Sequence, residues 1–373
     1  MKKLSFVPGE RAAVSSGTPE ELARADYVLF AVAAGKADAL LLKTGTRYWL
    51  IDAGYARSRG KLLFAMKLLG AERLDGVFVT HGDADHTEGL RWLAESPIPV
   101  GGWYVSAFSA ETKEGKHPAD KAAALRGKRV TRLRAGDRFD LEEAVLEVLS
   151  PDSLIKDKDD NNSLVLRLQT PCGSMLLCGD MEYRQEARLL KSSAELRCDV
   201  LKVPNHGDND VCSREFLVAA SPAVSVISTD TREKRDTPDP GLLKRLEQIC
   251  STVLQTQHAE AGAAVALLPG QILTALVPLP RAAAGIDITD MDGRTLTLTN
   301  ISRDEIELSG WYLLSDKRSR LLILPEGTVL APGRSLTVGG EGEKKTIGKK
   351  KDSVTLYDRW GRLVSSKGPE TDP

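Results

Sequence analysis

The chain has 373 residues, of which 42% are hydrophobic and 28% are charged, and its formal net charge is −1. Its length allows more than one domain, since domains average about 100–200 residues. The near-zero charge gives no overall reason to expect a nucleic-acid or membrane partner, and leaves a local basic patch open. There is no Cys-x-x-Cys pair among the five cysteines and no apolar stretch of about 18 residues, which excludes a disulfide framework and a membrane-spanning helix.

The first residues bear on the compartment. The basic opening of the chain could start a signal peptide, but the apolar segment of residues 4–7 is too short and runs into Pro8. We therefore expect a cytoplasmic protein with reduced thiols. Export stays open if the natural chain carries a leader ahead of this sequence.

Residues 1–24 are polar and punctuated by glycine, serine and proline, so we predict a lead-in there. From residue 25 to 277, apolar runs of strand length alternate with stretches of helical spacing, which is typical of layered α/β proteins. The predicted strands are residues 27–34, 39–42, 47–51, 74–80, 100–105, 130–133, 145–149, 163–168, 174–177, 199–203, 223–228, 252–255, 263–268 and 272–276. The predicted helices are residues 61–69, 87–95, 119–125, 182–190, 213–220 and 241–249.

The pattern changes after residue 277. Residues 278–285 are rich in proline and alanine and are predicted to be a linker. Over residues 286–367 only short strands separated by Gly- and Pro-containing turns fit, which predicts a small all-β sandwich. Residues 368–373 are predicted to be a flexible tail.

Metal-capable side chains stand at the ends of several predicted strands. A hydrolytic dinuclear site needs two cations about 3.5–4 Å apart, held by imidazoles and carboxylates. One turn cannot surround two ions, so several strand ends must contribute. The strand ends offer Asp52, His81, Asp83, Asp85, His86, Asp180 and His206.

Four motifs in this order resemble the metallo-β-lactamase superfamily: Leu-Ile-Asp-x-Gly, Thr-His-x-Asp-x-Asp-His, Leu-Leu-x-Gly-Asp and Pro-x-His-Gly. Asp83, in place of a second histidine, and the Asn-Ser-Leu-Val-Leu strand that starts at Asn162 are similar to the ComEC/Rec2-related branch, the metallo-hydrolase module of bacterial DNA-uptake proteins. The resemblance covers residues 25–277. It implies an αββα sandwich and two divalent metal ions, Zn²⁺ or Mn²⁺, with a bridging hydroxide.

The resemblance also implies roles. His81 and Asp83 would hold one ion, and Asp180 would bridge the two. Asp85, His86 and His206 would hold the other ion, with Asp85 and His206 also serving catalysis and Asp85 holding the nucleophilic water. Asp52, Asn162 and Asn205 would support the ligands from behind.

The chain departs from this branch at two positions. Asn205 stands where the branch usually has a histidine, and Thr237 stands where a His-Pro pair usually comes. A third histidine for the first ion is absent, and residues 159–161 lie in the region that would supply a ligand. Lys202 and Ser213 flank the last motif and could, with Thr237, meet a substrate phosphate, although a solvated strand face also explains Lys202. His117, in a polar loop, is predicted to be solvent-exposed.

Residues 286–367 resemble a lamin-tail domain, an immunoglobulin-like β-sandwich. The matching motifs are Leu-Ser-Gly-Trp, which ends at Trp311, and Gly-Thr-Val-Leu-Ala-Pro-Gly over residues 327–333. We predict that Trp311 anchors the core and that the domain binds or positions a partner, either a protein or nucleic acid. A lysine-rich run at residues 344–351 is either a solvated loop or a contact to a phosphate backbone.

Three functions follow as hypotheses. The first is a metal-dependent phosphodiesterase, most simply a nuclease acting on single-stranded DNA. The second is a hydrolase of the same fold acting on a thioester, a lactam or a small phosphate ester, because one scaffold hosts many chemistries. The third is a catalytically degenerate binding module.

Overall fold

The computed structural model of the protein describes residues 12–109, 117–233, 236–249, 251–280, 285–291, 295–315, 320–339 and 353–368. The chain divides into two compact units, Met1–Pro278 and Leu279–Pro373. In the described ranges, no helix combines the length and the apolar character needed to cross a membrane.

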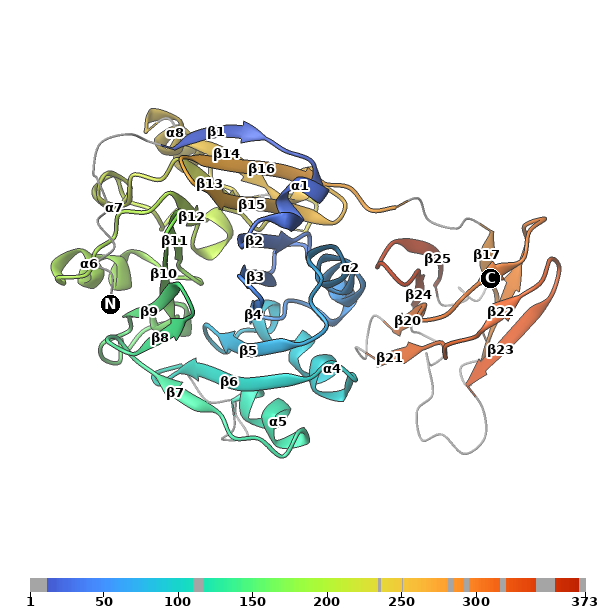
Figure 1. The fold of residues 1–373 in the computed structure, drawn as a ribbon. Coiled ribbons are helices and arrows are strands. Elements are labelled where there is room, and N and C mark those ends of the chain that lie inside the picture. Colours follow the sequence, from blue (N-terminus) through green and yellow to red (C-terminus); the bar gives the residue numbers. More distant parts are fainter. Residues whose placement is uncertain are drawn as a thin grey trace. The chain divides into compact units, whose positions relative to one another are not determined.

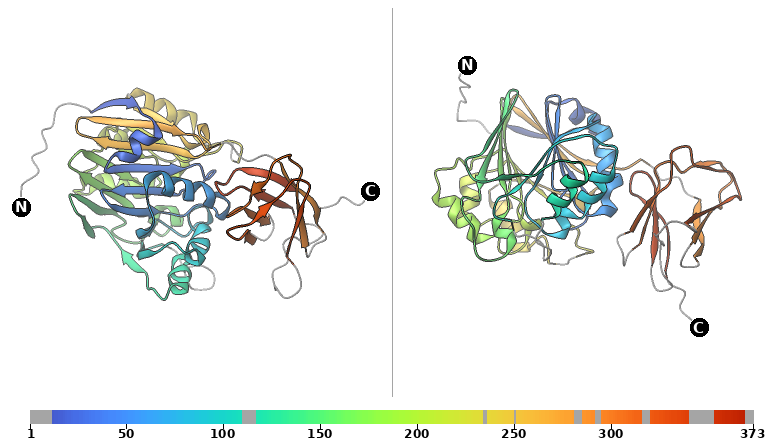
Figure 2. Two further views of the ribbon diagram at one scale, coloured as in Figure 1. Left: turned by 45° about the vertical axis from the view of Figure 1, so that its right-hand side comes forward. Right: turned by 90° about the horizontal axis from the view of Figure 1, so that it is seen from below.

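Two mixed β-sheets lie face to face in the first unit, with helices on the outer side of each (Figures 1 and 2). The nine-stranded sheet runs in the order β1 (Ala13–Ser16), β16 (Gln271–Val277), β15 (Gly262–Leu268), β2 (Tyr27–Val32), β3 (Leu40–Thr44), β4 (Arg47–Ile51), β5 (Leu74–Val79), β6 (Val100–Ser106) and β7 (Thr131–Leu133). The helices on its side are α1 (Pro19–Arg24), α2 (Arg59–Leu69), α3 (Ala84–Thr87), α4 (Gly89–Glu95) and α5 (Pro118–Leu125).

The second sheet of this unit has seven strands, in the order β14 (Thr252–Gln255), β13 (Val224–Ile227), β12 (Val200–Lys202), β11 (Gly173–Leu177), β10 (Val165–Thr170), β9 (Ala144–Ser150) and β8 (Arg138–Leu141). Its outer helices are α6 (Tyr183–Lys191), α7 (Arg214–Ala220) and α8 (Pro240–Gln248), drawn in green and yellow in Figure 2. The predicted αββα sandwich is therefore confirmed.

The main core fills the space between the two sheets. Side chains alternate along β9, where Leu146 and Val148 point inward. On β12, Val200 belongs to the core between the sheets and Leu201 to the core under the helices. The side chain of Lys202 therefore falls on the inter-sheet side of β12, because strand residues two apart share a face.

The predicted lead-in over residues 1–24 is wrong where the structure describes it. β1 extends the nine-stranded sheet by pairing in parallel with β16, with Ala13 opposite Gln271. Helix α1 starts at a capping box in which Thr18 accepts from the Glu21 backbone N–H and Glu21 accepts from the Thr18 backbone N–H. The strand β8, which the prediction also lacks, is a short polar edge strand.

The second unit is all-β in its described residues, which confirms that prediction. Its strands form sheets of three, two and four strands: β17 (Ile286–Met291), β18 (Thr295–Asn300) and β23 (Ser335–Gly339); β19 (Ile306–Glu307) and β22 (Val329–Leu330); and β21 (Arg320–Ile323), β20 (Tyr312–Ser315), β24 (Val354–Tyr357) and β25 (Leu363–Lys367). Trp311 is buried in its core, as predicted. The lamin-tail assignment stays a prediction. The lysine-rich run, most of the tail and part of the linker lie outside the described residues.

Candidate metal centre

The metal-capable side chains come from strand ends in both sheets. β4 leads into Asp52, and β5 leads into the turn that holds residues 81–86. In the facing sheet, β11 leads into Asp180, and β12 leads into a 3-10 turn, η3 (Asn205–Gly207). Parallel strands carry their carboxyl ends at one edge of a sheet, so these turns meet at one rim.

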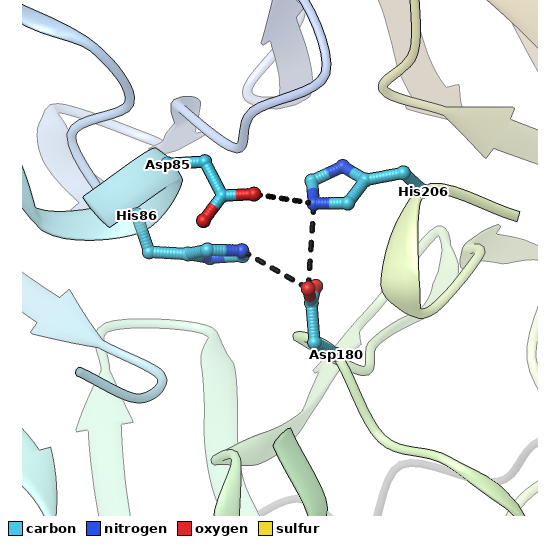
Figure 3. A group of neighbouring side chains, drawn as sticks. All are labelled: Asp85, His86, Asp180 and His206. Atoms are coloured by element: carbon cyan, nitrogen blue, oxygen red, sulfur yellow. Dashed lines mark ion pairs between the residues drawn. The ribbon is translucent and has the colours of Figure 1, made fainter. Parts of the chain in front are cut away.

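Four of these side chains converge on one point (Figure 3). His206 Nε2 lies 3.3 Å from Asp85 Oδ2 and 3.3 Å from Asp180 Oδ2. His86 Nε2 also lies 3.3 Å from Asp180 Oδ2. We call Asp85, His86, Asp180 and His206 the four-ligand group. It offers two imidazole nitrogens and two carboxylates, a donor set that Zn²⁺ and Mn²⁺ both accept.

A second group lies beside the first. His81 Nε2 is 3.9 Å from Asp83 Oδ2 and 3.8 Å from Asp160 Oδ1. We call these residues the three-ligand group. The rings of His81 and His86 are 4.2 Å apart at their centroids, so the two groups are neighbours. The side chains of Asp83 and Asp160 are 57% and 18% exposed, whereas His81 is fully buried, so solvent reaches the centre from the aspartate side.

Hydrogen bonds behind the imidazoles fix their orientation. His86 Nδ1 donates to Asp52 Oδ2 at 2.7 Å, and His206 Nδ1 donates to the Ser228 carbonyl at 2.9 Å. The Thr80 hydroxyl donates to Asp52 at 2.6 Å and therefore accepts from His81 Nδ1 at 3.1 Å. Each ring thus turns its Nε2 toward the centre, as metal-binding histidines do.

Burial of unpaired acceptors shows that the residues fit divalent cations. The Nε2 atoms of His81, His86 and His206 and Oδ1 of Asp180 are buried and have no hydrogen-bond partner among the described residues. Such atoms are destabilising unless something binds them. Four aspartates and three histidines meet here, and cations would neutralise the excess negative charge.

The pKa values reflect this crowding. Burial opposes charge on His86, but Asp180 and Asp52 outweigh it and raise the pKa of His86 well above its usual value. Burial would also raise the pKa of Asp85, but the adjacent His206 imidazole, 3.3 Å away, and the charge of His86 bring it to about 2. Burial, followed by Asp180 and Asp83, raises the pKa of Asp160 to about 7.

The η3 turn has an unusual backbone. Asn205, His206 and Gly207 have φ values of 42°, 53° and 83°, so three consecutive residues are left-handed. The conformation is held by the Asn205 N–H donating to the Gly179 carbonyl at 3.1 Å and by the Asp239 N–H donating to the Gly207 carbonyl at 2.8 Å. Non-glycine residues at such angles are characteristic of functional sites.

Two residues predicted to support the ligands bond elsewhere. The side-chain oxygen of Asn162 accepts from the Ile155 N–H at 2.9 Å, and its Nδ2 donates to the Ile155 carbonyl at 3.1 Å. Asn162 therefore closes the loop before Asp160. Asn205 Nδ2 donates to Glu182 Oε1 at 3.5 Å, away from the four-ligand group.

The three predicted substrate contacts all bond within the protein; Lys202 and Thr237 are buried, whereas Ser213 is half-buried, and its contact with a substrate stays a prediction. Lys202 is fully buried, because it lies between the sheets, where its ammonium is 2.7 Å from Asp38 Oδ2. The burial of Lys202 also rules out the alternative prediction that its side chain lies on a solvent-exposed strand face. Ser213 caps α7 by accepting from the Phe216 N–H, and Thr237 is buried and bonded to Thr229.

Two residues at the site, Asp160 and Asp38, are absent from the predicted ligands, and the predicted exposure of a third residue, His117, is wrong. Asp160 joins His81 and Asp83, and the acidic run at residues 159–161 was the available signal. Asp38 precedes β3, and no sequence pattern around it predicts that it lies at the site. His117 is fully buried, contrary to the predicted exposure, because it caps α5 and contacts the Ser109 hydroxyl at 3.1 Å.

Comparison with known proteins identifies the family of the chain. The family model described as "Metallo-beta-lactamase superfamily" matches residues 33–231. The chain is 28% identical over 195 residues to ComE operon protein 3 of Bacillus subtilis (strain 168), which covers 51% of this chain and 24% of that protein. It is 28% identical over 231 residues to competence protein ComA of Neisseria gonorrhoeae, which covers 61% of this chain and 30% of that protein. The chain thus spans less than a third of either relative.

Among solved structures, the metallo-beta-lactamase fold protein YhfI from Bacillus subtilis aligns with a TM-score of 0.41 at 13% identity, over 64% of this chain and 98% of that one. The family model covers more than half of the chain, and the curated relatives are ComEC-related. The chain belongs to the metallo-beta-lactamase superfamily.

Proposed function

We propose that the chain is a metal-dependent phosphodiesterase that cleaves nucleic acid, with single-stranded DNA as its favoured substrate. The observation that carries this proposal is the pair of adjacent ligand groups, with their unpaired Nε2 atoms turned toward one centre. Two divalent ions side by side are the arrangement that phosphatases and nucleases use.

Each of the two ligand groups would bind one metal ion. The four-ligand group would hold one ion, and the three-ligand group would hold the other. When bound, the ions supply a nucleophile at neutral pH and neutralise the charge that develops on a phosphoryl group. Mn²⁺ suits the oxygen-rich three-ligand group, and Zn²⁺ suits the two imidazoles of the four-ligand group.

The chain's own residues orient the reactants. Asp85 has an ionised carboxylate that is 20% exposed, so it can accept a hydrogen bond from an attacking water. His81, His86 and His206 are fully buried and held from behind, so they stay fixed while the substrate enters from the side of Asp83. Fixed ligands of this kind lower the reorganisation that the reaction requires.

The choice of nucleic acid rests on the relatives and on the second unit. One relative is named a competence protein, and competence is the uptake of DNA. The second unit would bind or position the substrate, with the lysine-rich run at residues 344–351 contacting phosphates. Replacing these lysines should weaken DNA binding and flatten its dependence on salt, and unchanged binding would exclude the contact.

Hydrolysis assays test the proposal. Wild-type protein with added Mn²⁺ or Zn²⁺ should hydrolyse bis-p-nitrophenyl phosphate and single-stranded DNA, and Asp85→Ala should lose most of this activity. Asp152→Ala is the matched control, because its side chain is 69% exposed and contacts Arg188 instead of a ligand group. An Asp85→Ala variant as active as the wild type would refute the assignment.

A binding module is the second candidate, and two contacts favour it. Asn205 and Thr237 stand where the ComEC/Rec2-related branch usually has histidines. The side chain of Asn205 bonds to Glu182, and that of Thr237 bonds to Thr229. Such a module would retain metal without hydrolysing substrate. Metal analysis combined with a panel of phosphodiester, phosphomonoester, thioester and lactam substrates separates this candidate from the phosphodiesterase and from other hydrolases.

A further inference from the structure

A buried ion pair lies directly behind the four-ligand group. Asp38 is 1% exposed and Lys202 is fully buried, and Asp38 Oδ2 lies 2.7 Å from Lys202 Nζ. Asp38 precedes β3 of the nine-stranded sheet, whereas Lys202 ends β12 of the seven-stranded sheet. The pair therefore joins the two sheets in the layer between them.

Stability alone does not account for this pair. Taking two charges out of water costs several kcal/mol per ion, and their attraction offsets this only when further hydrogen bonds satisfy both groups. Neither carboxylate oxygen of Asp38 makes a well-aligned hydrogen bond with the described residues, so its contact with Lys202 is mainly electrostatic. Apolar residues of similar volume would stabilise the same layer at least as well.

The pair contacts both ligand-bearing turns of the four-ligand group. The Asp38 N–H donates to the Asp85 carbonyl at 3.2 Å, which ties Asp38 to the turn after β5. Asp38 Oδ1 lies 3.9 Å from His206 Nδ1, on the side opposite the metal-facing nitrogen. Lys202 Nζ donates to the Val203 carbonyl at 2.9 Å, on the segment that leads into η3.

These contacts have two consequences for metal binding. They fix the separation of Asp85 and His206, which come from different sheets and have no covalent connection nearby. Asp38 also lies beside the His206 ring, 3.9 Å from Nδ1, and so limits the room in which that ring can turn away from its bond to the Ser228 carbonyl. Lys202 compensates the charge of Asp38, which makes this buried arrangement tolerable.

We propose that Asp38 and Lys202 are positioning residues that hold Asp85 and His206 at metal-binding separation and set the affinity of the four-ligand group. They touch neither substrate nor metal. The proposal rests on metal binding by this group and does not depend on which substrate is hydrolysed.

The test replaces both charges together. Asp38→Asn with Lys202→Met keeps the volumes and leaves no unpaired charge. Co²⁺ affinity is measured calorimetrically on the full chain in an Asp160→Asn background, which disables the three-ligand group and isolates the four-ligand group. We expect the affinity to fall about 10–100-fold, the usual effect of removing a residue that orients a metal ligand. The Co²⁺ absorption spectrum should change as well, because the ligand geometry relaxes.

A charge-neutral change at another ion pair is the matched control. Arg91→Met with Glu95→Gln removes an exposed pair on α4 whose side chains are 77% and 52% exposed. It should leave the Co²⁺ affinity and spectrum unchanged. If the buried double variant fails to fold, Asp38→Glu keeps both charges paired, moves the carboxylate by one methylene and should lower the affinity in the same direction.

A folded variant with wild-type Co²⁺ affinity and spectrum would overturn the proposal. So would an equal loss of affinity in the control variant, since the effect would then be general. A wild type that binds Co²⁺ but hydrolyses no phosphodiester, with lowered affinity in the double variant, would refute the proposed function alone, whereas unchanged affinity in the double variant would refute the positioning role whatever the hydrolysis.

Discussion

His117 gives the clearest link between one side chain and the pH dependence of stability. Its Nδ1 accepts from the Ala119 N–H at 3.1 Å and so caps α5. Ser109 donates its hydroxyl hydrogen to Asp159 at 2.8 Å, so Ser109 Oγ accepts from His117 Nε2 at 3.1 Å. Both ring nitrogens are satisfied only in the neutral form, because a second ring proton would face the Ala119 N–H.

The magnitude follows from the pKa shift. Burial, followed by the charge of Arg132, lowers the pKa of His117 from 6.5 to about 4. Between these values the unfolded chain binds more protons than the folded chain, so stability is complete above the unfolded pKa and declines as the pH falls toward the folded pKa. Linkage gives a loss of about 2 kcal/mol in the free energy of unfolding between about pH 7 and about pH 5.

Chemical denaturation at these two pH values tests the shift. His117→Asn keeps a side-chain oxygen that can cap α5 and removes the titrating ring. We expect the wild type to lose about 2 kcal/mol more than His117→Asn between about pH 7 and about pH 5, with near-UV circular dichroism as the readout. Parallel losses in the two proteins would refute the reasoning.

Other perturbations have expected outcomes of their own. Asp52→Asn removes the charge that orients His86, so Mn²⁺ affinity by calorimetry should fall about 10–100-fold; an unchanged affinity would contradict the role of this contact. Asp160→His replaces an oxygen with an imidazole and should raise the zinc-to-manganese ratio retained in a competition measured by elemental analysis, and a constant ratio would show that Asp160 is no ligand. Adding Mn²⁺ at about 100 times its Kd to chelator-treated protein should raise the free energy of unfolding by about 2.7 kcal/mol, and an equal gain in Asp180→Asn would place the ion elsewhere. Trp311→Ala should destabilise the second unit by about 3–5 kcal/mol in denaturation, and an unchanged free energy of unfolding would show that Trp311 does not anchor that core.

The sequence reveals ligands that follow apolar strands. Asp52, Asp180 and His206 each come after such a strand, so the linear pattern of apolar and polar residues is enough to predict that they lie at a sheet edge. Asp160 lies in an acidic segment with no strand directly before it. Several aspartates lie close together in this segment, and the sequence alone does not show which of them is the metal ligand.

Long-range pairing explains the remaining misses. Lys202 lies in a strand and carries a charge, which predicts a solvated face unless a buried partner exists, and that partner, Asp38, is far away in the sequence. β1 is short and half polar, and its strand character comes from pairing with β16, near the end of the first unit. Local composition records neither contact.

The left-handed backbone at η3 explains how the chain can differ from its branch at residue 205. Asparagine and histidine are among the few side chains that tolerate a φ value such as the 42° of Asn205. Exchanging one for the other therefore changes the chemistry of the side chain and preserves the course of the loop. His206, one residue later, keeps its bond to the Ser228 carbonyl and its direction. This position can thus diverge in evolution while the ligand beside it stays in place.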